Sequence, residues 1–274
     1  MKGTGIQTDP YLIDTWDDFF DMTNDSVDTY YMLMNDLDGN NWNGGIFGHT
    51  NIVHTNLDGN GHMIRNLYYT HSGNADSAAL MQPHELGGTW KNLRIENVLT
   101  NISLFGGDNA AAVYFESCVI SAECFSIARY IAAAFTECTI SAKLQAALRK
   151  TFSNYDVITL VRCSVNCRIV NPTYDWDAVS ATDSRIEMQL EKAPSLNAYH
   201  SITVKNCVLA IEMLANATYS YKIKGDSALP SVLDSTLWGA TPTSGITNVI
   251  MLPTENMKNA DALNAAGFTV ARVS

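Results

Sequence analysis

One frame of apolar and polar positions recurs eight times between residues 64 and 239. Its copies begin at residues 64, 90, 115, 135, 160, 181, 204 and 232, so successive starts lie 20 to 28 residues apart. Residues 115–122 and 135–142 have nearly the same sequence. Within a copy, apolar and polar side chains alternate with a period of two, which is typical of a β-strand with one buried face. The pattern predicts short strands, and its recurrence predicts that they stack.

Two positions of the frame hold side chains that we expect in the interior. The fourth position is small or apolar in every copy, and the sixth is apolar in every copy. Stacked coils place like residues over like at a spacing of about 4.8 Å, so each position predicts a ladder. The fourth position reads Leu67, Leu93, Cys118, Cys138, Cys163, Ser184, Cys207 and Ser235, and the sixth reads Tyr69, Ile95, Ile120, Ile140, Val165, Ile186, Leu209 and Leu237.

The third position of the frame predicts a sharp bend. It is polar in all eight copies and is Asn or Asp in five of them. Asn and Asp tolerate the left-handed backbone conformation that such bends require. The predicted bend residues are Asn66, Asn92, Ser117, Glu137, Arg162, Asp183, Asn206 and Asp234.

A strand, a bend and a strand in each of about eight stacked coils predict an all-β chain folded as a parallel β-helix. A propeller or a sandwich is the alternative for short strands of regular spacing, but both need antiparallel hairpins with Asn-Gly or Asp-Gly turns. Here the Asp-Gly pairs at 38–39 and 58–59 occur only before the repeats begin. The repeat therefore favours the β-helix.

Short helices are expected to close the two ends, because an open rod exposes apolar rungs and unpaired backbone. Residues 15–22 predict a helix with Thr15 as N-cap, whose Trp16, Phe19 and Phe20 plug the first coil. Residues 254–266 predict a second helix, 268–270 a returning strand, and 246–251 a ninth, shorter rung. The chain is then one continuous domain, with an N-terminal capping region at 1–63, coils at 64–245 and a C-terminal cap at 246–274.

Several phrases near the N-terminus form one ordered series, at residues 3–5, 9–13, 30–33, 36–38 and 57–67. This series resembles the opening of bacterial and phage surface proteins with a pectin-lyase-like right-handed β-helix and GLUG-type repeats. Residues 257–268 are similar to endings in that group. The resemblance implies a right-handed parallel β-helix and a phage structural protein, but its motifs are structural, so it transfers no activity.

The amino-acid composition argues against some classes of binding partner. The chain has 17 Lys and Arg against 28 Asp and Glu, a formal net charge of -11, and no basic run. This argues against nucleic acid and anionic membranes as partners. No stretch approaches 18 uninterrupted apolar residues, so we expect no membrane insertion. Residues 1–10 lack the apolar segment of a signal peptide, which predicts a protein made in the cytosol.

The six cysteines are expected to be free, buried thiols. Neighbouring rungs bring their Cα atoms within reach, but parallel Cβ vectors have the wrong geometry for a disulfide. No pair has zinc-ligand spacing. Buried reduced thiols favour a protein that folds and assembles in the cytosol over a secreted one.

No catalytic residue, metal ligand or cofactor is predicted. Glu96 and Glu187 would lie about 19 Å apart, four coils along the rod, beyond the roughly 5–9.5 Å that glycoside hydrolysis uses. Glu137 and Asp183 lie two coils apart with Arg162 between them, which predicts an exposed ladder of charges. The spacing of the histidines suits no helical metal site.

Aromatic and acidic residues on long connections are the candidate binding residues, because such side chains can stack on sugars or contact a neighbouring subunit. They are Tyr174, Asp175, Trp176, Asp177, Tyr199, Tyr219 and Tyr221, together with Trp238, which we expect to point outward from the last full rung.

Three classes of function stay open. The first is a non-catalytic phage virion protein (a capsid decoration, head fibre or tail component), assembled in the host cytoplasm and contacting other virion proteins, copies of itself as in a homotrimer, or a host-surface glycan. The second is an adhesin-like module on the bacterial surface or secreted. The third is a polysaccharide depolymerase of the tailspike type, which needs a pair of carboxylates in one groove. The signal-free N-terminus, the cysteines and the resemblance favour the first.

Overall fold

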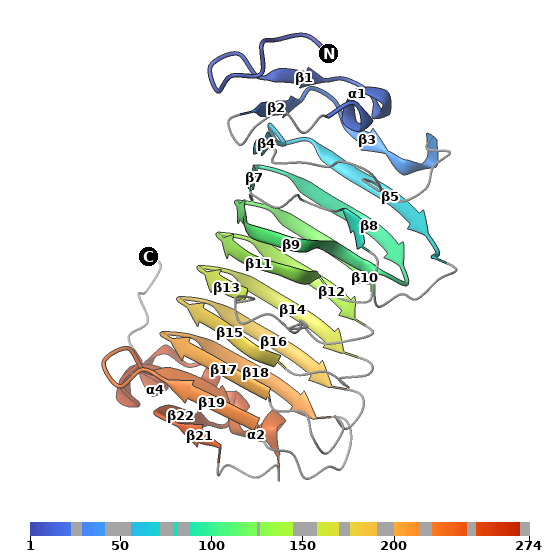
Figure 1. The fold of residues 1–274 in the computed structure, drawn as a ribbon. Coiled ribbons are helices and arrows are strands. Elements are labelled where there is room, and N and C mark those ends of the chain that lie inside the picture. The colour runs from blue at the N-terminus through green and yellow to red at the C-terminus, as the bar shows by residue number, and fades with distance from the viewer. Residues whose placement is uncertain are drawn as a thin grey trace.

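The computed structural model describes residues 1–22, 29–41, 56–71, 79–81, 88–124, 127–144, 158–169, 176–190, 200–213, 221–239 and 245–268. They form a rod of stacked coils with the N-terminus at one end and the C-terminal elements at the other (Figure 1). Every ladder between its strands is parallel, and each coil gives one strand to each of two sheets. The all-β parallel β-helix, or β-solenoid, predicted from the repeat is confirmed.

The first sheet, sheet 1, is twelve-stranded. Its strands along the rod are β1 (Tyr11–Ile13), β2 (Tyr30–Leu33), β4 (Asn56–Asp58), β7 (Gly88–Lys91), β9 (Ser103–Glu116), β11 (Ala128–Thr136), β13 (Ile158–Val161), β15 (Trp176–Thr182), β17 (His200–Lys205), β19 (Tyr221–Gly225) and β21 (Ile246–Thr247), with β6 (Ala79–Met81) paired to β9.

The second sheet, sheet 2, is ten-stranded. Its strands are β3 (Leu37–Asp38), β5 (Met63–Tyr69), β8 (Arg94–Thr100), β10 (Val119–Cys124), β12 (Thr139–Leu144), β14 (Ser164–Ile169), β16 (Arg185–Leu190), β18 (Val208–Met213), β20 (Ser231–Asp234) and β22 (Val249–Leu252). Six regular coils run from β7–β8 to β17–β18, and rungs with shorter strands extend the stack at both ends. The coil count therefore differs slightly from the eight predicted.

The predicted register is wrong in the first copy of the repeat. Ile64 pairs with Ile95, and Leu57 pairs with Trp90, so the first copy begins at Leu57 and not at Ile64. Leu67 accordingly pairs with Val98 and not with Leu93. The loop of residues 59–62 makes this bend longer than the later ones, which hid the alignment.

The register is also wrong in the last copy. Leu209 pairs with Leu233, which in turn pairs with Met251, so the predicted ladder members Ser235 and Leu237 lie outside it. After β20 the chain turns into helix α2 (Ser235–Trp238) because Asp234 Oδ1 accepts hydrogen bonds from the N–H groups of Thr236 and Leu237. The predicted bend at Asp234 is thus a helix N-cap with φ −66°.

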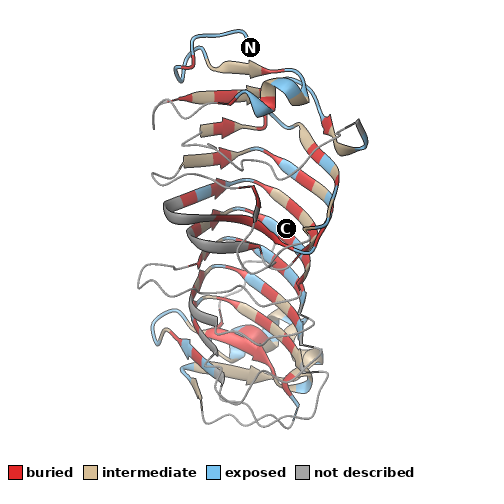
Figure 2. Cartoon of the chain, turned by 45° about the vertical axis from the view of Figure 1, so that its right-hand side comes forward, coloured by how far each residue is buried: buried red, intermediate tan, exposed pale blue. Residues whose placement is uncertain are grey.

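The interior is built from ladders of like side chains. All twelve ladder residues from Leu67 to Leu209 that are Leu, Cys, Ile or Val are buried, and buried and exposed positions alternate along the strands (Figure 2). Aromatic rings stack in sheet 1, where the Phe115 and Phe135 centroids lie 4.7 Å apart with the rings 10° from parallel. Stacking of near-parallel rings is favourable when they are offset. The contact between these rings therefore stabilises the coils in addition to the burial of their apolar area.

The bends of the central coils use non-glycine residues in the left-handed conformation, as predicted. Asn92, Ser117, Glu137, Arg162, Asp183 and Asn206 have φ between 49° and 56°. Asn66 also has a positive φ of 58°, but it lies within β5, in register with Asn97 of β8, which has φ 52° and lies where β8 is bulged against β10. Asn248 supplies the bend of the predicted ninth rung, β21–β22.

The N-terminal cap agrees with its prediction in its helix and its N-cap but not at Phe20. Helix α1 (Trp16–Phe20) begins after Thr15, whose side chain accepts from Asp18 N–H while Asp18 accepts from Thr15 N–H, a reciprocal capping box. Phe19 is buried beneath the first coil and Trp16 is partly buried, but Phe20 is 39% exposed.

The C-terminal segment is two short helices, α3 (Thr254–Met257) and α4 (Ala260–Ala265), and not the single helix predicted. Asn259 caps α4 and so separates the two. Leu263 and Phe268 pack with Val232, Val208 and Ile250, which are outward residues of sheet 2. These helices therefore cover a side of the last coils. The strand predicted at 268–270 falls mostly outside the described residues. A 3-10 turn, η1 (Gly39–Asn41), completes the elements.

Candidate functional site

The predicted binding residues do not form a loop site among the described residues. Tyr174, Asp175, Tyr199 and Tyr219 lie outside the described residues. Trp176 and Asp177 belong to strand β15 and Tyr221 begins strand β19, so these three lie on sheet 1 and not on connections.

The structure contradicts the prediction made for Trp238. It was expected to point outward from the last full rung, but it is 1% exposed and belongs to the core. The turn of α2 after Asp234 carries the indole inward because the chain leaves its strand direction at this point.

A shallow groove with a volume of about 450 Å³ crosses the outer face of sheet 2. It spans five consecutive strands, from β5 to β14. A groove across stacked strands presents side chains at the regular strand spacing of about 4.8 Å. Its lining residues are Tyr68, Asn97, Val98, Leu99, Ser121, Ala122, Glu123, Ser141, Ala142, Lys143, Asn166 and Arg168.

The middle of this groove is flat and polar. Ser121, Ser141 and Asn166 lie in one register column, and their short side chains leave the sheet accessible. Along the neighbouring column, Lys143 Nζ lies 2.7 Å from Glu123 Oε1, and Arg168 follows on the next strand. The groove thus offers hydroxyl and amide groups beside a charged edge with one more cation than anion.

The N-terminal end of the groove carries exposed apolar surface. Tyr68 is 52% exposed and Leu99 is 48% exposed, side by side on β5 and β8. The left-handed residues Asn66 and Asn97 fix this corner, because Asn97 Nδ2 donates to Asn66 Oδ1 at 2.6 Å and also to the hydroxyl oxygen of Tyr68. The Tyr68 ring is therefore held in place for stacking.

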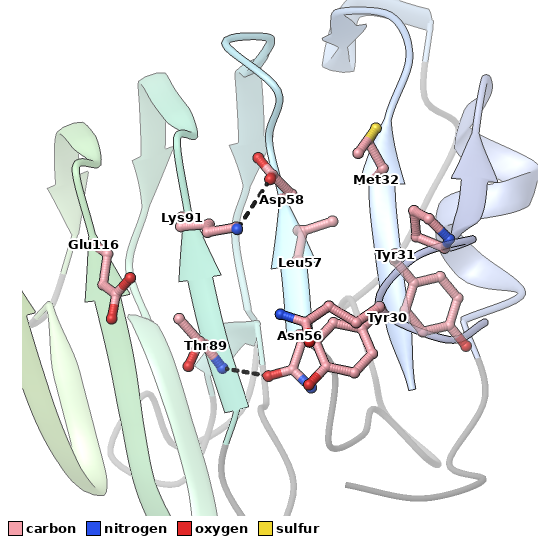
Figure 3. A pocket seen from close by; sticks show the side chains of 11 residues that line it. Tyr30, Tyr31, Met32, Asn56, Leu57, Asp58, Thr89, Lys91 and Glu116 are labelled. Carbon is pink, nitrogen blue, oxygen red and sulfur yellow. Dashed lines mark hydrogen bonds and ion pairs between the residues drawn. The ribbon is translucent and has the colours of Figure 1, made fainter. Parts of the chain in front are cut away.

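A smaller pocket of about 260 Å³ lies at the N-terminal end of sheet 1, on its outer face (Figure 3). Tyr30, Asn56 and Thr89 form one side, and Thr89 N–H donates to Asn56 Oδ1 at 3.2 Å. Lys91 Nζ lies 3.3 Å from Asp58 Oδ2, and Glu116 stands on the next strand beyond Lys91 (Figure 3). We call this hollow the N-terminal pocket.

Several carboxylates of the outer surface are engaged by basic or amide side chains of neighbouring coils. Glu137 forms an ion pair with Arg162 at 2.9 Å, as expected for the ladder of charges predicted at the third position of the repeat. Burial works against ionisation of Asp58, but hydrogen bonds from Asn60 N–H, Asn92 and Lys91 outweigh it and hold the pKa below its ordinary value. A hydrogen bond from Asn66 is the main cause that lowers the pKa of Asp38. Asp58 and Asp38 are thus stabilised as anions, which is opposite to what a general acid needs.

The six thiols are free and buried, as predicted. Four of them, however, also make hydrogen bonds at the bends. Cys138 Sγ donates to Thr136 O at 3.3 Å, and the corresponding Ser184 Oγ donates to Thr182 O at 2.8 Å. The side chain at this position thus gives a second hydrogen bond to a carbonyl that already accepts a backbone N–H from the preceding coil, as Thr136 O does from Ser117 N–H. Cys118 and Cys163 make the same bond, as does Cys207.

Burial and mutual hydrogen bonding suppress thiolate formation. The hydrogen bond with Cys118 raises the pKa of Cys138 to about 12, and it lowers the pKa of Cys118. Burial raises the pKa of Cys167 to about 12 and raises those of Cys124 and Cys207. A nucleophilic cysteine needs a lowered pKa and access to solvent, and these buried thiols lack that combination.

Two features are absent from the described residues. No group of three or more His, Cys, Asp or Glu side chains is arranged to hold a metal ion in that part of the chain. None of its helices is long and apolar enough to span a membrane.

No protein-family model and no curated protein matches the chain. A solved structure does match, described as a "putative immunoglobulin A1 protease from Bacteroides ovatus", with a TM-score of 0.53 and 12% identity over 96% of this chain and 89% of that chain. At this identity the likeness shows the parallel β-solenoid fold alone.

The groove residues were missed at the level of sequence, although they occupy outward positions of the same repeat. Their signal is the recurrence of short polar residues at one outward position, Ser121, Ser141 and Asn166. Tyr68 carried no such signal, because the left-handed residue Asn66 decides which way it faces.

Proposed function

We propose that this chain is a non-catalytic structural component of a phage virion, whose β-helix binds a linear host-surface polysaccharide in the groove on sheet 2. The groove carries the proposal. It combines a held aromatic ring at Tyr68 with the hydroxyl and amide groups of Ser121, Ser141 and Asn166. Aromatic stacking and hydrogen bonds to planar polar groups are the means by which proteins bind sugars.

The charge of the groove supports an uncharged or acidic polymer. Lys143 and Arg168 outnumber Glu123, in a chain whose formal net charge is -11. A locally cationic edge on an acidic protein attracts anionic groups of a ligand and suppresses association elsewhere.

Binding without cleavage is favoured by the acids of the groove. Glu123 is the single carboxylate among the described residues that line it, and it is paired with Lys143. Hydrolysis of a glycosidic bond ordinarily uses two carboxyl groups, one of them able to donate a proton. The depolymerase is therefore the less favoured alternative, and it predicts release of reducing ends.

The virion setting rests on the resemblance of the first 67 residues to phage surface proteins and on the reduced thiol ladder, which suits assembly in the host cytoplasm. The adhesin-like alternative shares the groove but predicts export. Capsid and portal genes beside this gene would support the virion, and export genes would contradict it.

Binding of the labelled protein to an array of bacterial surface polysaccharides tests the groove. We expect Tyr68→Ala to weaken binding by about tenfold, from the loss of one stacking contact, and Ser141→Arg to abolish it by filling the flat middle. Ser117→Arg is the matched control, since Arg162 shows that this bend position accommodates arginine. Binding that survives Ser141→Arg would contradict the groove. Reducing ends released from a bound polysaccharide would show catalysis.

A further inference from the structure

The N-terminal pocket is walled off at the end of the rod where the chain begins. Its strands β2, β4, β7 and β9 are consecutive in sheet 1, so the pocket extends over about 14 Å along the rod. Gln7 and Pro10 line its closed end. Hydrogen bonds fix this segment, because Tyr30 N–H donates to Gly5 O at 2.9 Å and Gly5 N–H donates to Asp9 O at 3.0 Å. A walled end suits a short ligand.

One column of outward side chains in the pocket carries an aromatic ring beside an amide and a hydroxyl group. All of its members are half-buried. An aromatic ring can stack on a sugar, and amide and hydroxyl groups both donate and accept hydrogen bonds, as sugar hydroxyls require. The members of this column are Tyr30, Asn56 and Thr89.

The neighbouring column carries an excess of negative charge. Asp58, Lys91 and Glu116 follow one another on β4, β7 and β9. Lys91 Nζ lies 3.3 Å from Asp58 Oδ2 and points away from Glu116 (Figure 3). Glu116 is exposed and makes no ion pair within the part of the chain that the structure describes. The pocket thus retains one carboxylate that is able to bind a cation.

From these groups we propose that the N-terminal pocket binds a short sugar that carries an unacetylated amino group. The ammonium group of the sugar donates to Glu116 in a charge-assisted hydrogen bond. The sugar ring packs on Tyr30, and its hydroxyl groups bind Asn56 and Thr89. The formal net charge of -11 on the chain favours the approach of a cationic ligand over an anionic one.

An extended peptide fits the pocket less well, although its amino terminus is also an ammonium group. Addition of a peptide strand needs a free sheet edge, whereas β2, β4 and β7 are each paired on both sides. The pocket lies on sheet 1 and the groove of the proposed function lies on sheet 2. The two sites can therefore be tested, and can fail, independently.

Calorimetric titration of the full chain with three disaccharides tests the ligand. We expect the glucosamine dimer to bind about fivefold more tightly than the N-acetylglucosamine dimer or cellobiose, since these lack the ammonium group. The difference should shrink at high salt, because screening weakens an exposed charge pair. Equal affinity for the three disaccharides would overturn the proposal, and so would a glucosamine dimer that does not bind.

Two variants with opposite effects locate the site. Glu116→Gln keeps the shape of the side chain and removes its charge, so it should weaken binding of the glucosamine dimer about fivefold. Lys91→Met removes the competing cation and should strengthen binding about threefold, a gain that misfolding cannot produce. Glu255→Gln, at an exposed carboxylate in α3 at the other end of the rod, is the matched control and should bind as the wild type does. An unchanged affinity in Glu116→Gln, or a loss in Lys91→Met, would overturn the proposal.

Discussion

The backbone N–H of Cys163 donates to Ser184 Oγ on the next coil at 3.1 Å. Two coils earlier along the rod, the same kind of bond joins Cys118 N–H to Cys138 Sγ at 3.4 Å. Cysteine and serine can thus both fill this position. It requires a small side chain that accepts a hydrogen bond from a backbone N–H of the preceding coil and donates one to a carbonyl at its own bend. The ladder is a chain of hydrogen bonds and not merely an apolar column.

Cys138→Ser should therefore be tolerated better than Cys138→Ala. Serine keeps both bonds of this position, whereas alanine leaves the buried Cys118 N–H without its acceptor, at a cost of about 1–3 kcal/mol, while Thr136 O keeps its bond from Ser117 N–H. Urea denaturation of both variants measures the difference. At Cys167, which stacks between Ala142 and Met188, we expect serine to be no better than alanine. Equal costs of serine and alanine at residue 138 would contradict the role of the bond.

Alkaline pH should destabilise the rod through its thiols. The pKa values of Cys138 and Cys167 are raised from 9.0 to about 12 in the folded chain, so between these values the unfolded chain loses protons that the folded chain keeps. Their contribution is fully present below pH 9 and is lost as the pH rises toward 12. The free energy of unfolding, measured from pH 8 upward, should fall less steeply in Cys138→Ser combined with Cys167→Ala. An identical slope would show that other groups govern the decline.

Gly59 should tolerate no side chain. An added Cβ would lie 2.5 Å from Asn92 O and 2.6 Å from Leu93 Cα, both backbone atoms of the next coil. We expect Gly59→Asn to cost about 1–3 kcal/mol by overpacking. Gly61→Asn is the contrast, because Gly61 has φ 79° and open space around it, and asparagine tolerates the left-handed region. Thermal denaturation compares the two, and equal losses would show that conformation and not contact decides.

The bend at Glu137 should discriminate by residue type. Its φ of 56° is left-handed, where a β-branched side chain is strained, so Glu137→Val should cost about 1–2 kcal/mol. Glu137→Asn should be close to neutral, since its ion pair with Arg162 is more than half exposed on both sides and contributes little. Thr139→Val, two residues on in strand β12, is the matched control and should cost little. A valine tolerated at both positions would contradict strain at the bend.

The sequence by itself determined the parallel β-helix, the interior ladders of the central coils and six of their left-handed bends. It could do so because each coil packs against coils of similar sequence. The alternation of apolar and polar residues within one coil, together with its recurrence, therefore already indicates which residues contact one another between coils. Thr15 as N-cap and the rung at residues 246–251 were likewise readable, because both depend on neighbours in the chain.

The tertiary structure alone decided the backbone conformation where the sequence repeat is interrupted, and which outward side chains of different coils lie side by side. The loop of residues 59–62 shifts the first register, and the left-handed residues Asn66 and Asn97 turn Tyr68 outward. The cap at Asp234 ends a strand and buries Trp238. The groove on sheet 2 unites outward residues from several coils. Their proximity depends on the register between strands, which is set by bulges and loop lengths that the period of the sequence does not contain.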